Sequence, residues 1–148
     1  MNILFVCTGN TCRSPMAEAV LKYKGKDHFK VKSAGVFAFD GNSATPQVEE
    51  VLKENNIKQE HQSSSLTKED LDWATYIFTM TASHKASIAN QYPHIADKLF
   101  TLKEFVLENP ANQDVVDPFG GNVEVYRRTY KELEELIDQL IVKLQRES

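Results

Sequence analysis

Short apolar runs and helix-like stretches alternate along this chain of 148 residues. Apolar runs rich in Ile, Val and Phe predict buried strands, whereas apolar residues three or four positions apart predict amphipathic helices. The longest helical pattern lies near the C-terminus, where an apolar residue recurs at this spacing from Tyr126 to Leu144. Strands are expected at residues 2–6, 29–34, 73–80 and 99–102, and helices at residues 14–21, 45–56, 67–70, 82–90 and 126–144.

Short polar residues mark the expected helix starts. Ser14 is expected to cap the first helix, with Pro15 at its first helical position. Thr45 and Thr67 open two later helical stretches. Side chains of this kind accept a hydrogen bond from the free N–H groups at a helix N-terminus, so they support the predicted boundaries.

The alternation of strands with helices predicts a parallel sheet with helices on both faces. We therefore expect an α/β fold: a single three-layer αβα domain over residues 1–148, with a central four-stranded parallel sheet of the flavodoxin-like type. Ligands in such folds bind at the carboxyl ends of the strands, near the point where the strand order reverses. The loop after the first strand is expected at such a place.

Composition narrows the possible functions. The formal net charge of −4 gives no reason to expect nucleic acid or an anionic membrane as a partner. The apolar start of the chain follows no basic region and is too short for a signal peptide or a membrane span. With two cysteines in the chain, a reducing, cytoplasmic setting is expected rather than a disulfide framework.

The cysteines and histidines lack the spacing of a metal site. No metal and no cofactor are therefore expected. Each histidine is expected at the surface or in packing: His28, His61, His84 and His94.

The segment after the first strand carries the strongest chemical signal. It joins a strand to a helix through a glycine-containing loop, so several backbone N–H groups and the positive end of the helix dipole would point at one place. Cys7 opens the loop and Arg13 closes it, which places a thiol beside a guanidinium that can bind two phosphoryl oxygens. This combination predicts an anion site suited to attack on phosphorus; the alternative is a buried cysteine at a strand end. The segment reads Cys7-Thr8-Gly9-Asn10-Thr11-Cys12-Arg13-Ser14.

These eight residues resemble the signature of the low-molecular-weight protein tyrosine phosphatases. The resemblance covers the whole length and includes two further segments, Ser33-Ala34-Gly35 and Asp117-Pro118-Phe119. It implies a phosphatase that works through a phosphocysteine intermediate. A non-catalytic phospho-binding module is the alternative from another class. Thioredoxin-coupled arsenate reductases share the loop but need further cysteines downstream, and this chain has none after Cys12.

The resemblance assigns roles to individual residues. Cys7 would be the nucleophile, with its pKa lowered by the helix N-terminus and by Arg13, and Ser14 would donate a hydrogen bond to it. Asp117 would protonate the leaving group and then activate water. The expected catalytic residues are Cys7, Arg13 and Asp117, and the expected substrate-binding residues are Thr8, Gly9, Asn10, Thr11, Cys12 and Ser14.

Thr11 bears on the choice of substrate. It resembles the bacterial protein-arginine-phosphatase branch, whose tyrosine-directed relatives usually carry Ile there. A hydroxyl suits a planar, polar guanidino group better than an aromatic ring. Phosphoarginine in proteins is therefore the expected substrate, with phosphotyrosine as the alternative, unless Thr11 is a neutral variant. A protein-arginine kinase is then the implied counterpart, and a monomer is expected.

Two further residues near the loop have open interpretations. The resemblance implies that Cys12 forms a disulfide with Cys7 under oxidation, which would protect the nucleophile; the alternative is a small buried filler. Phe119 is expected either at the substrate entrance or in the core.

Overall fold

The sheet has four parallel strands in the order β2–β1–β3–β4 in the computed structural model, which describes residues 1–108 and 110–147. The central strand β1 pairs with β2 on one side and with β3 on the other. The α/β fold expected from the sequence is confirmed. The strands are β1 Asn2–Cys7, β2 Lys30–Gly35, β3 Tyr76–Thr79 and β4 Leu99–Thr101.

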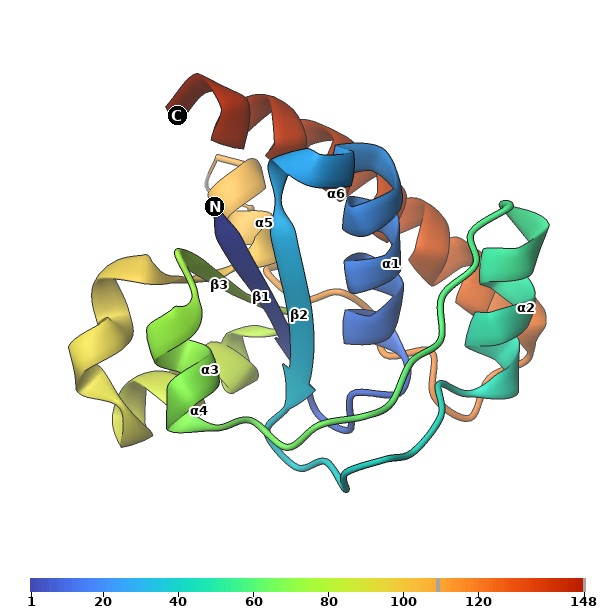
Figure 1. Cartoon of the computed structure of the whole chain (residues 1–148), viewed down its shortest axis with the longest axis horizontal. Coiled ribbons are helices and arrows are strands. Elements are labelled where there is room, and N and C mark those ends of the chain that lie inside the picture. Colours follow the sequence, from blue (N-terminus) through green and yellow to red (C-terminus); the bar gives the residue numbers. More distant parts are fainter. Residues whose placement is uncertain (109, 148) are drawn as a thin grey trace.

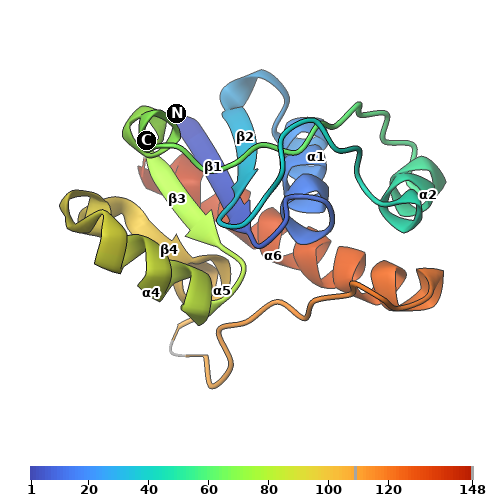
Figure 2. The same cartoon turned by 90° about the horizontal axis from the view of Figure 1, so that it is seen from below.

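Helices cover both faces of this sheet (Figures 1 and 2). One face carries α1 (Arg13–Gly25), α2 (Pro46–Glu54), α5 (Leu102–Val106) and α6 (Val123–Glu147), and the other carries α3 (Lys68–Trp73) and α4 (Ala82–Gln91). Two short 3-10 helices complete the described chain: η1 (Lys26–His28) and η2 (Pro93–Lys98). Among the described residues no helix, α6 included, has the length and apolar character needed to cross a membrane.

Successive residues of β1 enter two separate cores. Ile3 and Phe5 pack on the side of α1 and α6, whereas Leu4 and Val6 pack on the side of α3 and α4. All four side chains are fully buried. Burial on both faces explains why the sequence of β1 is continuously apolar instead of alternating.

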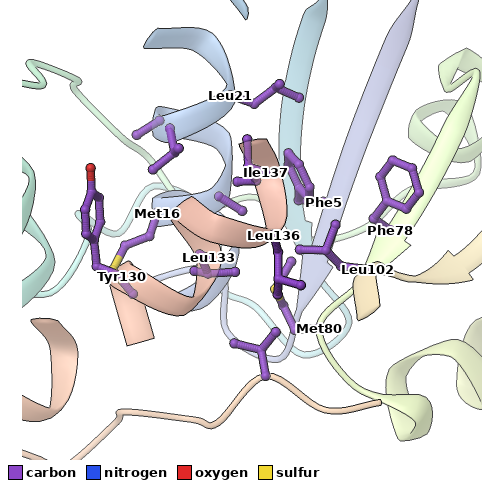
Figure 3. Packing of buried hydrophobic residues seen from close by; sticks show 14 of the residues in the cluster. Phe5, Met16, Leu21, Phe78, Met80, Leu102, Tyr130, Leu133, Leu136 and Ile137 are labelled. Carbon is purple, nitrogen blue, oxygen red and sulfur yellow. The ribbon is translucent and has the colours of Figure 1, made fainter. Parts of the chain in front are cut away.

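The long helix α6 supplies the main apolar face of the larger core. In Figure 3 its side chains Leu133 and Ile137 lie between Met16 of α1 and Phe5 of the sheet. The predicted apolar stripe is confirmed, because every member of it is buried: Tyr126, Tyr130, Leu133, Ile137, Leu140 and Leu144.

The start of α1 differs from the expectation. The helix begins at Arg13, and its N-cap is Cys12, whose side chain makes no capping hydrogen bond. The prediction that Ser14 caps the helix is therefore wrong. The Ser14 hydroxyl lies inside the helix and contacts the sulfur of Cys7, so it serves the loop rather than the backbone of α1.

Two strand boundaries also differ. The fourth strand ends at Thr101, because Thr101 caps α5 through reciprocal hydrogen bonds with Glu104. No helix was expected at this position from the sequence. Trp73 ends α3 and does not open the third strand, which begins at Tyr76.

The strand order places a crevice at the carboxyl edge of the sheet. The chain moves from β1 to β2 on one side and from β3 to β4 on the other, so the connections after β1 and β3 diverge. Residues 8–12 fill this position. The end of β2 lies against them, and a Cβ atom on Gly35 would overlap the carbonyl oxygen of Thr8.

We expect Leu133→Ala to lower the free energy of unfolding by about 2–5 kcal/mol, because it leaves a cavity in a closed core. Denaturant unfolding would measure the change. Val142→Ala, on the exposed part of the same helix, is the control and should stay within about 0.5 kcal/mol of the wild type. Equal, small changes for the two variants would contradict the assigned core position.

Candidate active site

A pocket of about 230 Å³ opens at the carboxyl edge of the sheet, where Cys7 ends β1 and Arg13 begins α1. Figure 2 views this edge, past which the segment leading to α6 runs. The pocket brings together most of the residues expected from the sequence. Its lining consists of Cys7, Thr8, Gly9, Thr11, Cys12, Arg13, Asp117 and Phe119.

The side chains of Asn10 and Ser14 do not line the pocket. Both are fully buried between the loop and the rest of the fold. Asn10 has a left-handed backbone, with φ of 56°, which asparagine tolerates better than most residues. Its Nδ2 donates to the hydroxyls of Ser14 (2.8 Å) and Ser33 (2.9 Å), and its Oδ1 accepts from the backbone N–H of Ser64 (2.9 Å). The side chain of Asn10 therefore fixes the shape of the loop.

This network has a defined direction. The Ser33 hydroxyl donates to the carboxylate of Glu18, which can only accept, so Ser33 must accept from Asn10. The other N–H of Asn10 donates to Ser14. The proton of Ser14 is then free to be donated to the sulfur of Cys7, 2.8 Å away, and the thiolate, which has no proton, can only accept it.

Burial raises the pKa of the Cys7 thiol, which is 3% exposed. Hydrogen bonds from Ser14, the charge of Arg13 and the backbone near Asn10 lower this pKa but do not offset the burial. The expectation of a lowered pKa is therefore wrong: the sequence shows the neighbours of the sulfur but not how completely the fold encloses it. Formation of the thiolate depends on these few donors.

Arg13 connects the loop to the distant segment that carries Asp117. Its Nη1 donates to the carbonyl of Val115 (3.1 Å), and its Nη2 lies 3.6 Å from the carboxylate of Asp117. The Asp117 side chain is 52% exposed and accepts a hydrogen bond from the backbone N–H of Phe119 (3.0 Å). Phe119 is 72% exposed, so it stands at the entrance and not in the core.

The segment before Asp117 is hydrogen-bonded to the chain between the end of β3 and the start of α4. The backbone N–H of Val115 donates to the carbonyl of Met80 (2.8 Å), and the backbone N–H of Ala82 donates to Asp114 (2.8 Å). These bonds hold the carboxylate of Asp117 over the pocket. No spacing in the sequence indicates them, because they join residues more than thirty positions apart.

Several polar residues at the site were missed by the sequence analysis. His61 contacts the carbonyl of Asn10 (2.6 Å), and His84 contacts the hydroxyl of Thr8 (2.9 Å). Tyr126 lies 3.5 Å from the sulfur of Cys12, and burial raises its pKa to about 12. The sequence did not place these residues at the site, because it does not show which helices and connections pack against the loop.

A larger and more open hollow, of about 630 Å³, lies elsewhere, between the end of α5 and α6. It shares no lining residue with the pocket around Cys7. Among the described residues, no group of three or more acidic, histidine or cysteine side chains could hold a metal ion.

A doubly wound fold with a cysteine and an arginine at the two ends of the loop after the first strand is the arrangement expected of a phosphatase. The model of the low molecular weight phosphotyrosine protein phosphatase family matches residues 2–148, and the chain belongs to this family.

Two similar proteins carry the name protein-arginine-phosphatase. The one from Geobacillus stearothermophilus is 54% identical, over 98% of this chain and 97% of its own length. The one from Bacillus subtilis is 47% identical, over 99% of each chain. A low molecular weight protein-tyrosine-phosphatase, PtpB of Staphylococcus haemolyticus, is 40% identical over 95% of this chain and 97% of its own.

Solved structures agree with this assignment. The YwlE arginine phosphatase from Geobacillus stearothermophilus is 53% identical and superimposes with a TM-score of 0.94, covering 99% of this chain and 94% of its own. A C7S mutant of a YwlE arginine phosphatase, described as having a phosphorylated active site serine, is 47% identical with a TM-score of 0.92. It covers 98% of this chain and 96% of its own.

We expect Ser14→Ala to slow alkylation of Cys7 by iodoacetamide about tenfold or more at pH 7. A hydrogen bond to a charged group contributes about 1.5–3 kcal/mol, and the buried thiolate would lose it. The pH dependence of the alkylation rate measures the effect. Ser87→Ala, on the exposed face of α4, is the control, and a rate in Ser14→Ala that matched this control would remove Ser14 from thiolate formation.

Proposed function

We propose that this protein is a cysteine-dependent protein phosphatase that hydrolyses phosphoarginine in proteins. The observation that carries the proposal is the meeting of Cys7, Arg13, Asp117 and Thr11 around one pocket. Two relatives named protein-arginine-phosphatase, 54% and 47% identical over nearly the whole chain, support it.

In the first step the phosphoryl group is bound by Arg13 and by the backbone N–H groups of residues 8–12. The thiolate of Cys7 attacks phosphorus, an S–P bond forms, and the P–N bond to the arginine breaks. Asp117 gives its proton to the departing nitrogen, so the arginine leaves as a complete guanidinium group. Asp117 lines the pocket and is open to solvent, which suits proton exchange with the leaving group and with water.

In the second step water attacks the phosphocysteine. Asp117, now ionised, takes a proton from the water, the S–P bond breaks, and Cys7 returns as a thiolate with inorganic phosphate as the product. Negative charge grows on the phosphoryl oxygens in both transition states. The fixed donors of the loop and Arg13 stabilise that charge.

Thr11 is the residue that favours phosphoarginine over phosphotyrosine. It lines the pocket beside Cys12, with its hydroxyl 3.8 Å from that sulfur. A polar group here suits the guanidino nitrogens, whereas an aromatic ring would need an apolar wall. Phosphotyrosine remains the second candidate, because the exposed ring of Phe119 at the entrance could pack against the ring of a tyrosine.

The proposed activity implies a setting for the protein. A protein-arginine kinase would supply its substrates. The two free cysteines suit a reducing, cytoplasmic setting, and a monomer is proposed. Under oxidation, a disulfide between Cys7 and Cys12 would protect the nucleophile from irreversible products. These features extend the proposal and rest on the same loop.

We expect Asp117→Asn to lower kcat by about 10²- to 10⁴-fold, because the amide neither gives nor takes the required proton. Steady-state kinetics across the pH range would measure this. Asp97→Asn, at an exposed position away from the pocket, should keep the activity of the wild type. Wild-type turnover of Asp117→Asn at every pH would exclude the acid–base role.

On matched phosphorylated peptides, we expect kcat/KM of the wild type to be higher for phosphoarginine than for phosphotyrosine. Thr11→Ile should shift the ratio of the two values toward phosphotyrosine by about tenfold or more, because it replaces a polar wall with an apolar one. Thr11→Ser keeps the hydroxyl and should keep the preference.

Cys7→Ser provides the inactive control for both peptides. A wild type that prefers phosphotyrosine would keep the mechanism but replace the substrate, and an unchanged ratio in Thr11→Ile would remove Thr11 as the selecting residue. Turnover by Cys7→Ser equal to the wild type would contradict a covalent mechanism.

A further inference from the structure

His84 is a buried histidine that lies beside the loop of residues 8–12. The mechanism proposed above does not use it. It lies in the first turn of α4, where its backbone N–H donates to the hydroxyl of Thr81 (3.1 Å), and it is 7% exposed. Its Nε2 lies 2.9 Å from Oγ1 of Thr8. Its Nδ1 is buried and has no hydrogen-bond partner among the described residues.

A histidine in this position is costly if packing is its only role. A buried polar atom without a partner lowers stability, and a leucine would fill a similar volume without that cost. The other nitrogen, Nε2, is the one whose contact could offset this cost. That nitrogen makes one contact, with Thr8 of the pocket lining.

The protonation state of His84 follows from its surroundings. Burial lowers its pKa to about 4, and the charge of Arg13 adds to this effect, while the carboxylates of Asp114 and Asp117 oppose it. The ring is therefore neutral at neutral pH and carries one N–H. An unpaired buried N–H is rarer in proteins than an unpaired acceptor, so the hydrogen belongs on Nε2, where it can be donated to Thr8.

This bond determines what the hydroxyl of Thr8 can do. Because Oγ1 accepts from His84, the proton of Thr8 is free to donate in another direction. Thr8 is exposed and lines the pocket together with Cys7 and Arg13. A rotatable hydroxyl thereby becomes an oriented donor at the mouth of the anion site.

We propose that His84 is a positioning residue that orients the hydroxyl of Thr8 as a donor to a phosphoryl oxygen of the substrate. The inference rests on the proposed function, since it adds a donor to the same phosphate site. It does not depend on which phosphorylated residue is the substrate. Thr8 would touch the phosphoryl group, and His84 would act through Thr8 alone.

The first test measures the tautomer and the affinity for inorganic phosphate. Nitrogen-15 NMR of the wild type should show a neutral ring with the hydrogen on Nε2 at pH 7. Titration with inorganic phosphate should show affinity about two- to tenfold lower in Thr8→Val, the loss expected for one hydrogen bond. His84→Leu should also lower the affinity measurably, by a factor no larger than that of Thr8→Val.

The double variant His84→Leu/Thr8→Val should bind phosphate as Thr8→Val does, because His84 acts through the hydroxyl that is already absent. Thr8→Ser keeps the hydroxyl, and His84→Gln keeps a side-chain N–H donor. Each of these variants should therefore retain most of the phosphate affinity of the wild type. Three results would each overturn the proposal. The first is a ring hydrogen on Nδ1, and the second is unchanged phosphate affinity in His84→Leu. The third is a loss of affinity in the double variant that equals the product of the two single losses.

Thermal unfolding separates positioning from a merely structural role. The Tm of His84→Leu should equal or exceed that of the wild type at pH 7, because the variant buries no unpaired nitrogen. Its advantage should grow as the pH falls from about 6.5 to 4, because over this range the histidine of the unfolded wild type gains a proton while the buried ring, with its pKa lowered to about 4, stays neutral. A lower Tm with unchanged phosphate affinity would make His84 structural and overturn the inference.

If His84→Leu fails to fold, His84→Gln and Thr8→Val replace it in the comparison. His84→Gln should then bind phosphate more tightly than the double variant His84→Gln/Thr8→Val. Equal affinities of these two variants would overturn the inference. A wild type that binds inorganic phosphate but prefers phosphotyrosine would change the proposed substrate and leave this inference intact. A wild type with no affinity for inorganic phosphate would contradict both the proposed function and the inference about His84.

Discussion

The active loop depends on one side chain held in an unusual backbone conformation. Asn10 adopts a left-handed φ, and its amide links Ser14 of α1 to Ser33 of β2 and to the backbone at Ser64. Because every hydrogen bond of this amide is made inside the fold, the loop cannot relax without exposing or orphaning several groups at once. The geometry around Cys7 therefore follows from the packing of the whole carboxyl edge of the sheet.

The reactivity of the Cys7 sulfur is a balance between enclosure and hydrogen bonding. Enclosing Cys7 excludes water and strengthens its contacts with Ser14 and Arg13, but the same enclosure disfavours the thiolate. The carboxylate of Glu18 contributes from a distance, since it forces Ser33 and then Asn10 to donate in one direction. Glu18 thus helps to orient the hydroxyl of Ser14 toward the sulfur of Cys7, and it adds no negative charge beside that sulfur.

The sequence was sufficient for the sheet and for the residues of the loop, because both depend on local signals. An unbroken apolar run indicates a strand buried on both faces, and Cys7 and Arg13 stand close together in the chain. Local signals failed at the start of α1, where the hydroxyl of Ser14 serves a sulfur instead of the helix end. They also gave no indication that His84 lies against Thr8, since that contact joins residues 76 positions apart.

The bond between Arg13 and the carbonyl of Val115 has a consequence for the entropy of binding. A free arginine side chain loses about 1.5–2 kcal/mol of conformational freedom when it is immobilised. Arg13 is already buried and held at Nη1, so that loss occurs once, during folding. A phosphate bound in the proposed site would meet a guanidinium whose orientation is set in advance, and its binding free energy would not be reduced by ordering that side chain.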